Sequence, residues 1–393
     1  MTIEPKIRAF HDEMTAWRRD LHAHPELGYE EHRTSELVAA KLAEWGLEVH
    51  RGLAGTGVVA TLEGRAGPSN RAVGLRADMD ALPMDEVSGV PHASTTPGRM
   101  HACGHDGHTT MLLAAAKYLS ETRNFAGRVH FIFQPAEEML AGGEQMVKDG
   151  LFELFPCDQV FGMHNAPQLP PGQIGVRAGP VLASADFFEI TLTGRGGHGA
   201  YPHTVIDPAV VGAHIITALQ TLVARELDPL DNGVVSITRM HVGSTDNVIA
   251  PTAVLGGTVR AFKPETRTRL VDGVHRISRC VAEGLRAQAR VRFTDAAYPP
   301  TIATEDEAAF AAGVAAEVVG EAGLVWDHPP AMGGEDFSFM LQKVPGAFVM
   351  LGQQGGDDPI QCHDPRFDFN DAILPIGATF WARLVERTLA AGG

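Results

Sequence analysis

One nine-residue stretch, residues 100–108, gathers side chains that bind metal ions. It holds Cys103, three histidines and Asp106 among glycines, directly before a segment predicted to be a helix over 109–120. Thiolate and imidazole are ligands that zinc and similar metals prefer, and glycine lets the backbone approach a bound ion. A tight loop without a metal is the alternative, but so many ligand types seldom gather in one such loop. The stretch therefore predicts a metal site.

Two adjacent carboxylates follow a second apolar run. Residues 129–133 are typical of a buried strand, and the chain continues through Gln134 to Glu137 and Glu138. Neighbouring residues on a turning chain point in different directions, so one glutamate can bind a metal while the other transfers protons. A solvated pair of glutamates is the usual alternative. The position at a strand end favours the functional interpretation.

Other polar residues also follow predicted strands. Asp78 and Asp80 come after the strand 72–76, and His164 comes directly after the strand 160–163. In open α/β sheets ligands gather beyond the carboxyl ends of the strands, so these side chains should meet at one edge. A lone histidine is more often a core or loop residue, but the repeated strand-end context favours a site.

The elements that would position these residues alternate between strand and helix. Two helices are expected within 7–45, and a strand at 57–62 follows them. Further helices are expected near 143–150, 305–319 and 376–391, with a strand at 347–351. This alternation predicts an α/β protein with an open, mostly parallel sheet flanked by helices.

The middle of the chain has a different rhythm. Its pattern is strand 187–193, helix 208–226, strands 234–240 and 254–262, helix 266–287 and strand 290–294. This β-α-β-β-α-β order is ferredoxin-like. Asp207 is the expected N-cap of the first helix, with Pro208 at its first position. We expect a catalytic domain, 1–184 and 295–393, split by an inserted domain, 185–294.

Composition excludes several classes of protein. The 393 residues carry a formal net charge of -16, which argues against binding to nucleic acid or to an anionic membrane. The start of the chain lacks an apolar signal segment, and no uninterrupted apolar run approaches the ~18 residues of a membrane span. Four scattered cysteines are too few for a disulfide framework. A cytoplasmic protein with free thiols is expected.

Motifs of other enzyme classes do not occur in the sequence. There is no HExxH, GxSxG or Walker motif, and the glycine-rich residues 194–199 lie in the inserted domain without a phosphate-binding pattern after them. Redox chemistry with a dinucleotide is therefore disfavoured. Cysteine hydrolysis at Cys103 or Cys362 remains an alternative, but it would leave the surplus of histidine and glutamate unexplained.

In these residues the sequence resembles the aminoacylase and carboxypeptidase family of dinuclear metallopeptidases. Within that family it is most similar to the amidohydrolase branch, which includes hippurate hydrolase, N-acyl-L-amino acid amidohydrolase and indole-acetyl-amino-acid hydrolase. The resemblance spans nearly the whole chain. The matching segments are residues 18–27, 75–83, 103–108, 134–138, 162–165, 194–198, 333–337 and 363–367.

The resemblance implies a zinc-aminopeptidase-like catalytic domain that binds two divalent metal ions. Manganese or zinc would serve, and cobalt or nickel are possible. Glu137 would be the general base, and Asp80 would orient a ligand. Asp78 stands where other branches have a histidine ligand and is not assigned as one. The implied ligands are Cys103, His105, Glu138, His164 and His363.

The implied reaction is hydrolysis of the amide bond of N-acyl amino acids to a carboxylic acid and an amino acid. From the inserted domain, which would mediate dimerisation and act as a lid, His198 would stabilise the oxyanion, while Asn247 and Arg260 would bind substrate. A homodimer or homotetramer is expected. A dipeptidase or carboxypeptidase acting at the same site, and a non-catalytic metal- or ligand-binding protein, remain alternatives. The sequence leaves the acyl group and the amino acid open.

Overall fold

The computed structural model describes residues 1–294 and 297–391, and within them the chain forms two compact units. The first unit comprises Met1–Val181, Ile302–Pro329 and Asp336–Gly393, and the second comprises Leu182–Thr301 and Pro330–Glu335. The predicted domain boundary after residue 294 falls at residues 295–296, outside the described residues. The roles assigned to the two domains stay predictions.

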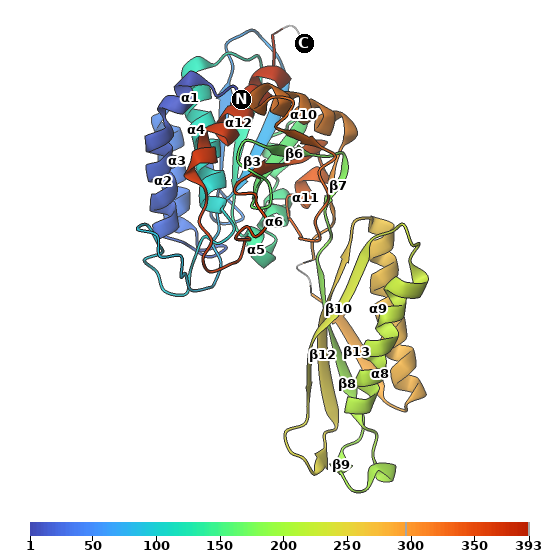
Figure 1. Ribbon diagram of the computed structural model, residues 1–393. Helices are drawn as coiled ribbons and strands as arrows, with labels where there is room; N and C mark the ends of the chain where they lie inside the picture. The colour runs from blue at the N-terminus through green and yellow to red at the C-terminus, as the bar shows by residue number, and fades with distance from the viewer. Residues whose placement is uncertain (295–296, 392–393) are drawn as a thin grey trace. The chain divides into compact units, whose positions relative to one another are not determined.

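The first unit is built on one large sheet. Its strands are β1 (Glu48–Leu53), β2 (Gly57–Glu63), β3 (Ala72–Asp78), β4 (Arg128–Gln134), β5 (Gln159–Ala166), β6 (Ile174–Val176), β15 (Leu324–Trp326) and β16 (Gly346–Gly352). They lie in the order β1-β2-β4-β3-β5-β16-β6-β15. Figure 1 labels β3 and β6 of this sheet among the helices of the first unit. The central strands β4, β3, β5 and β16 run parallel, whereas β1, β2 and β4 pair antiparallel, as do β16 and β6.

The predicted α/β fold with a mostly parallel sheet is confirmed, but the antiparallel flank was not predicted. Strand β1 has only one fully buried residue, Leu53, so its sequence lacks the apolar run that marks a strand. Strands β6 and β15 are each three residues long and too short to show a pattern. Their pairing partners, which lie far away in the sequence, hold them in the sheet.

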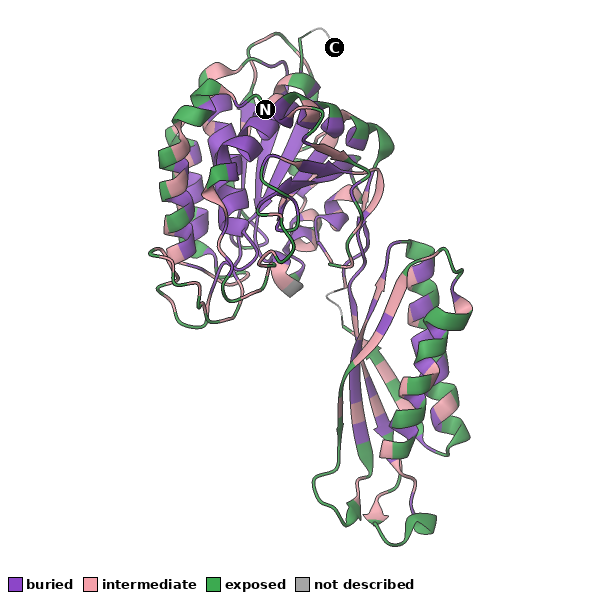
Figure 2. Ribbon diagram, in the orientation of Figure 1, coloured by how far each residue is buried: buried purple, intermediate pink, exposed green. Residues whose placement is uncertain are grey.

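The longer helices of the first unit differ from expectation mainly at their ends, whereas its helices of four residues were not predicted. They are α1 (Pro5–Ala9), α2 (His11–Ala23), α3 (His32–Glu44), α4 (His105–Thr122), α5 (Glu137–Leu140), α6 (Gly142–Lys148), α7 (Leu151–Leu154), α10 (Glu305–Val319), α11 (Ser338–Leu341) and α12 (Leu374–Thr388). Helix α4 is almost wholly buried and packs against α12 and β3 (Figure 2). It begins at His105, four residues earlier than predicted, so that its first turn carries part of the histidine cluster.

The start of the chain forms three helices where two were expected. The first helix ends before Phe10, whose backbone has φ -85° and ψ 0°, and α2 begins directly after it. A short helix therefore precedes α2. Lys117 of α4 lies over the ring of Phe10, and its ammonium is 4.4 Å from the ring centre. The predicted break between the second and third helices, near His24, is present.

The second unit has the predicted β-α-β-β-α-β order. Its elements are β8 (Asp186–Thr193), α8 (Pro208–Thr221), β10 (Gly233–Val242), β12 (Thr252–Ala261), α9 (Pro264–Gly284) and β13 (Gln288–Phe293). The strands form an antiparallel sheet in the order β10-β12-β8-β13. The predicted N-cap is confirmed, because the Asp207 carboxylate accepts a hydrogen bond from the backbone N–H of Ala209 at 2.8 Å.

Helix α8 and the π-helical turn after it, Leu222–Glu226, form the most apolar helical segment in the described residues. Residues Pro208–Glu226 are long and apolar enough to cross a membrane by length and composition alone. However, Val211, Ile215, Leu219 and Leu222 pack into the core of the second unit with the four-stranded sheet. The segment is therefore accounted for as a sheet-packing helix.

Candidate metal centre

The candidate site lies at the edge of the large sheet where β3, β4 and β5 end. Asp78 is the last residue of β3, and Asp80 follows it. Glu137 and Glu138 begin α5, three residues beyond the end of β4. His164 lies within β5 rather than after it, because this strand continues to Ala166. Parallel neighbours end at one edge, so these side chains converge.

The structure brings together all five residues that were predicted to bind metal. Cys103, His105 and His164 present donor atoms within 4.8 Å of one another, as do Cys103, Glu138 and His363. The two groups share Cys103. Glu137 joins a third group of the same kind with His105 and Glu138, which places the predicted base beside the predicted ligands.

Glycines allow the cluster loop to pack tightly. Gly104 has φ 96°, and a methyl group on it would lie 2.3 Å from Asn165 Oδ1. A methyl group on Gly107 would lie 2.3 Å from a ring carbon of Phe369. Any larger residue at either position would displace the neighbouring side chain, so the path of the loop that carries Cys103 and His105 requires glycine.

Asp80 links two of the predicted ligands. The Nδ1 atom of His105 lies 2.9 Å from the Asp80 carbonyl oxygen and 3.2 Å from Asp80 Oδ1. The other oxygen of the same carboxylate accepts a hydrogen bond from the Glu138 N–H at 2.8 Å. The opposite ring nitrogen of His105, Nε2, is buried and has no hydrogen-bond partner. Asp80 therefore orients His105 so that Nε2 is available as a ligand.

The histidine and the thiol at the centre of the cluster have opposite pKa shifts. Burial, with the nearby His108, lowers the pKa of His164 well below its usual value, which favours the neutral ring that binds metals. Its Nε2 lies 3.3 Å from Cys103 Sγ. The hydrogen bond to Cys362, burial and the charge of Glu138 raise the pKa of Cys103 well above normal. A thiolate here requires neighbouring positive charge, which a metal cation supplies.

His363 reaches the cluster from the loop after β16. Its backbone has φ 67°, which is uncommon for a residue other than glycine, and its N–H donates to the Ala102 carbonyl at 2.7 Å. The Nε2 atom lies 3.1 Å from Glu138 Oε1, and this hydrogen bond raises the pKa of His363 although burial opposes it. The strained backbone thus places the ring against Glu138.

Asp78 has partners within the protein that account for its charge. Its carboxylate lies 2.6 Å from the fully buried Arg76 guanidinium and 2.6 Å from His108 Nδ1. Burial alone would raise the pKa of Asp78, but the charges of His105 and Arg76 outweigh it and hold the pKa well below its usual value. Asp78, His105 and His108 could together hold a cation by geometry. We keep the prediction that Asp78 is not a ligand.

A buried charge network, which no sequence motif predicts, supports the cluster loop. Asp106, next to His105, lies 2.8 Å from His22 Nδ1, and the His22 Nε2 atom lies 3.3 Å from Glu86. Arg18 is fully buried and bonds to Asp371 at 2.6 Å. These residues lie within recognised motifs or near them, but nothing in one sequence shows that they meet.

The predicted substrate-binding residues lie at two ends of the second unit. His198 in β9 (Gly197–His198) is exposed and pairs with β11 (Val248–Ile249), next to Asn247. Arg260 lies near the far end of β12, over the Phe187 ring at 5.0 Å. Thr252, at the start of β12, is about 27 Å from it, at about 3.4 Å per residue. Arg260 is therefore not brought together with the other two within this unit.

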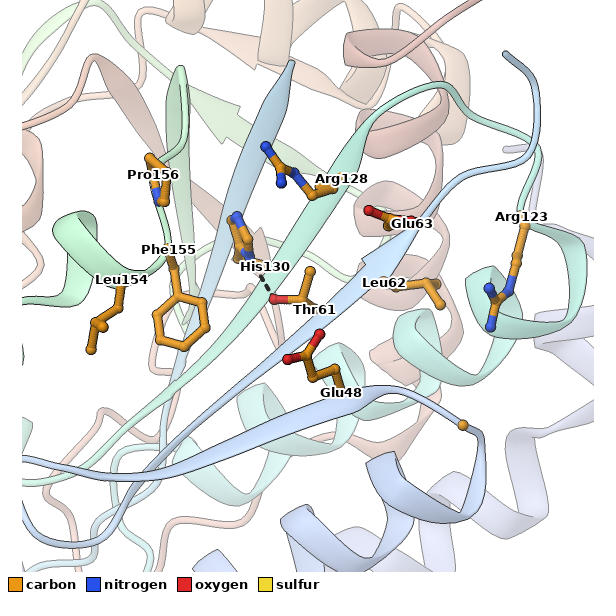
Figure 3. Close-up of a pocket in the computed structure, with 11 residues that line it drawn as sticks. Glu48, Thr61, Leu62, Glu63, Arg123, Arg128, His130, Leu154, Phe155 and Pro156 are labelled. Atoms are coloured by element: carbon orange, nitrogen blue, oxygen red, sulfur yellow. Dashed lines mark hydrogen bonds between the residues drawn. The ribbon is translucent and has the colours of Figure 1, made fainter. Parts of the chain in front are cut away.

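A separate hollow of about 350 Å³ lies over β1, β2 and β4 (Figure 3). It is lined by Glu48, Glu63, Arg128 and Phe155, and by His130, whose Nδ1 is 2.9 Å from the Thr61 hydroxyl. Burial lowers the pKa of His130 to about 4, so its ring is neutral near pH 7. The hollow lies toward the start of β4, whereas Glu137 follows the end of β4. It is not part of the metal cluster.

Comparison with known proteins identifies the family. Residues 74–387 match the peptidase family M20/M25/M40. The chain belongs to this family. Hippurate hydrolase from Campylobacter jejuni is 39% identical over 389 residues, which cover 99% of this chain and 100% of the relative. N-acetylcysteine deacetylase from Bacillus subtilis is 39% identical over 385 residues, 97% of this chain and 98% of the relative.

A solved structure shows the same fold. The dinuclear metal-binding peptidase of the M20 family from Bacillus subtilis superposes with a TM-score of 0.82 at 35% identity. The superposition covers 97% of this chain and 99% of that one. The resemblance to the dinuclear metallopeptidase family, inferred from motifs, is confirmed.

Replacing Asp80 by Asn should weaken metal binding by about 10- to 100-fold. The amide can still accept from His105, but its NH₂ group faces the Glu138 N–H, so one of the two contacts is lost. Competition for metal with a coloured chelator would measure the effect. The matched control is Asp85→Asn, because Asp85 is an exposed carboxylate that accepts from the Gly98 N–H at 2.8 Å. Equal affinities in the two variants would contradict the assigned role.

The buried pair of His22 and Asp106 should make stability fall between neutral and alkaline pH. Burial lowers the pKa of His22, but the hydrogen bonds that its ring donates to Asp106 and Glu86 outweigh burial and raise the pKa from 6.5 to about 9. Protonation therefore favours the folded state. The stabilisation is complete below pH 6.5 and is lost as pH rises through 9, by about 3 kcal/mol in all.

The measurement is the free energy of unfolding in urea from pH 6 to pH 9.5 at a fixed metal load. His22→Gln removes the titrating group, so its curve should be flatter than that of the wild type over this range. His24→Gln is the matched control, since His24 is a partly exposed histidine on the same segment. Parallel curves for wild type and His22→Gln would refute the prediction.

Proposed function

We propose that the protein hydrolyses the amide bond of N-acyl amino acids, releasing a carboxylic acid and an amino acid, with two divalent metal ions. The observation that carries this proposal is the position of Glu137. One of its carboxylate oxygens lies within 4.8 Å of donor atoms of Glu138 and His105. A binding protein needs ligands but no additional carboxylate at that position. The named activities of the relatives support the same reaction class.

The donor set fits two cations. Cys103, His105, Glu138, His164 and His363 would hold them, in two groups that share Cys103. The Nε2 atom of His105 is buried and makes no hydrogen bond within the described chain, which supports a neighbouring cation. The Cys103 thiol, whose pKa is raised, would need such a cation to ionise. We propose zinc or manganese, with cobalt or nickel as further possibilities. The thiolate favours zinc because it is a soft ligand.

The residues of the chain supply the proton transfers and the orientation. The ions, when bound, lower the pKa of a water molecule and polarise the amide carbonyl. Glu137 accepts the proton of the attacking water and then delivers it to the leaving nitrogen. Asp80 keeps His105 and Glu138 in place during the reaction, since its two oxygens contact both residues.

We propose substrate contacts from the second unit. Arg260 would bind the carboxylate of the amino-acid part, while His198 and Asn247 would contact the reacting carbonyl. These residues lie at opposite ends of the unit, and one small substrate cannot reach both ends. A homodimer or larger homo-oligomer, in which different copies serve different ends, resolves this difficulty.

The exposed side of α8 is a suitable surface for such an association. Val210 is 50% exposed, and Ala213, one turn further along α8, is also exposed. The other side of the helix packs into the unit's core (Figure 2). A contiguous exposed apolar patch can mark an interface. We propose a cytoplasmic homo-oligomer that acts on a small molecule and binds neither nucleic acid nor membrane. The free cysteines of the described chain are consistent with this location.

Replacing Glu137 by Gln should abolish turnover while leaving metal content unchanged. The loss should be at least about 100- to 10,000-fold, the range for a general acid–base group. Amine release from N-acyl amino acids, N-benzoylglycine and N-acetyl amino acids included, measures it after reloading with zinc or with manganese. A chelated sample should be inactive.

The control for this test is Glu144→Gln. Glu144 lies in α6 and pairs with Lys148 at 2.9 Å, outside the cluster, so its loss should leave turnover unchanged. If the wild type released no amine from any of these substrates with either metal, the proposed substrate class would be refuted. Full activity of Glu137→Gln would refute the assigned base.

A charge on the exposed side of α8 should weaken self-association. Val210→Lys places an ammonium in the proposed interface, and sedimentation velocity should show a shift from oligomer toward monomer. The control is Leu230→Lys, because Leu230 is 90% exposed and lies beyond the helix. A monomeric wild type, or an unchanged Val210→Lys oligomer, would exclude this surface.

A further inference from the structure

Glu31 is a fully buried carboxylate outside the metal cluster. It immediately precedes α3, and both of its oxygens have partners. Oε2 accepts a hydrogen bond from the Thr56 hydroxyl at 2.6 Å. Oε1 accepts one from the backbone N–H of Ala136 at 2.8 Å. Burying a carboxylate costs free energy of folding. A glutamate that is buried in spite of this cost is therefore a candidate for a functional role.

The second of these contacts reaches the turn that carries the predicted base. Ala136 directly precedes Glu137, is fully buried and has φ 56° and ψ 43°, a left-handed conformation that alanine rarely adopts. Its carbonyl accepts from the Gly142 N–H at 2.9 Å. The strained residue is therefore fixed on both sides, on its N–H by Glu31 and on its carbonyl by α6.

The segment before Glu31 also presses against this turn. A methyl group added to Gly28 would lie 3.0 Å from the Ala136 Cβ and 2.7 Å from Leu140 Cδ1. Tyr29 donates a hydrogen bond from its hydroxyl to the Leu140 carbonyl at 3.0 Å. Residues 28–31 thus contact α5 at its beginning and at its end.

We propose that Glu31 is a positioning residue for Glu137 and Glu138, which it aims by holding the Ala136 N–H in the left-handed turn. The proposal rests on the proposed function, because it takes Glu137 as the base and Glu138 as a ligand. The hydrogen bond is lost if the acceptor is removed, and the turn can then relax toward a right-handed conformation. Glu137 would move with it.

The acceptor matters in this role, and the charge does not. Burial and the nearby Asp80 raise the pKa of Glu31 to about 7, so the neutral acid is accessible near neutral pH. A neutral carboxyl keeps a carbonyl oxygen that accepts from Ala136. Glutamine offers the same oxygen, and the Thr56 hydroxyl can rotate to accept from its NH₂ group. Glu31→Gln should therefore work, whereas Glu31→Leu, of similar size, should not.

Glu26 provides a matched control on the same segment. Its two oxygens accept from the backbone N–H groups of Arg33 and Thr34, at 2.9 Å and 2.8 Å, in the first turn of α3. Glu26→Leu also removes two hydrogen bonds from a glutamate near α3, so it should destabilise the protein in a similar way. Within the described chain, neither of these side-chain hydrogen bonds of Glu26 involves the turn at Ala136.

The kinetic test compares kcat and KM at saturating metal for the wild type and the three variants. Glu31→Leu should lower kcat about 100-fold, the cost of a misplaced catalytic group, with KM changed less than about 3-fold. Glu31→Gln should stay within about 5-fold of wild type, and Glu26→Leu should keep its kcat. Equal kcat for Glu31→Leu and Glu26→Leu would overturn the proposal, as would a Glu31→Gln loss as large as that of Glu31→Leu.

Hydrogen exchange tests the same proposal without any substrate. In Glu31→Leu the amides of residues 136–138 should exchange at least about 10-fold faster than in wild type, with no such change in Glu31→Gln or Glu26→Leu. Unchanged protection in Glu31→Leu would overturn the positioning role. If wild type turns over no substrate, the proposed function fails, and this measurement still decides the role of Glu31. Should Glu31→Leu not fold, Glu31→Asp, too short to reach both partners, replaces it with the same expectations.

Discussion

The structure depends on balancing negative charges that are buried together where β3 and β4 end. Arg76 is fully buried and bonds to Asp78 at 2.6 Å, Gln134 at 2.8 Å and Asp336 at 3.0 Å. A buried ion pair adds little net stability, but removing one partner is costly because the other is left uncompensated. The guanidinium therefore fixes two strand ends and the segment at Asp336 relative to one another, and the site extends from these strand ends.

The candidate metal centre also contains closely spaced negative groups. Asp80, Glu137 and Glu138 bring carboxylates close together there, and the charges of Glu138 and Glu137 add to the hydrogen bond from Cys362 and to burial in raising the pKa of Cys103. The pKa of His164 is lowered instead by burial and by the nearby His108. Two divalent cations would complete the balance, so that binding of metal and ordering of the site are one event. Asp78 connects the two sets of charges, because its carboxylate contacts both Arg76 and His108.

Sequence patterns predicted much of this arrangement because they are local. Strand ends, the β-α-β-β-α-β order and the N-cap at Asp207 follow from periodicity and residue type within short windows. The pairing of Arg76 with Asp336 joins residues 260 positions apart and leaves no local trace. Strand β1 was missed because its exposed sequence has no apolar run, and β5 runs on through His164 because β16 pairs with it to its end.

The feature that is hardest to predict from the sequence is the backbone conformation of two residues in or beside the candidate metal centre. Ala136 and His363 both have positive φ, which is uncommon for any residue other than glycine. Such backbone costs on the order of 1–3 kcal/mol and persists only where surrounding contacts over-determine it. Here a buried carboxylate and a carbonyl from distant segments supply those contacts. Local propensity fails at these positions because hydrogen bonds from distant segments, rather than residue type, determine the backbone conformation.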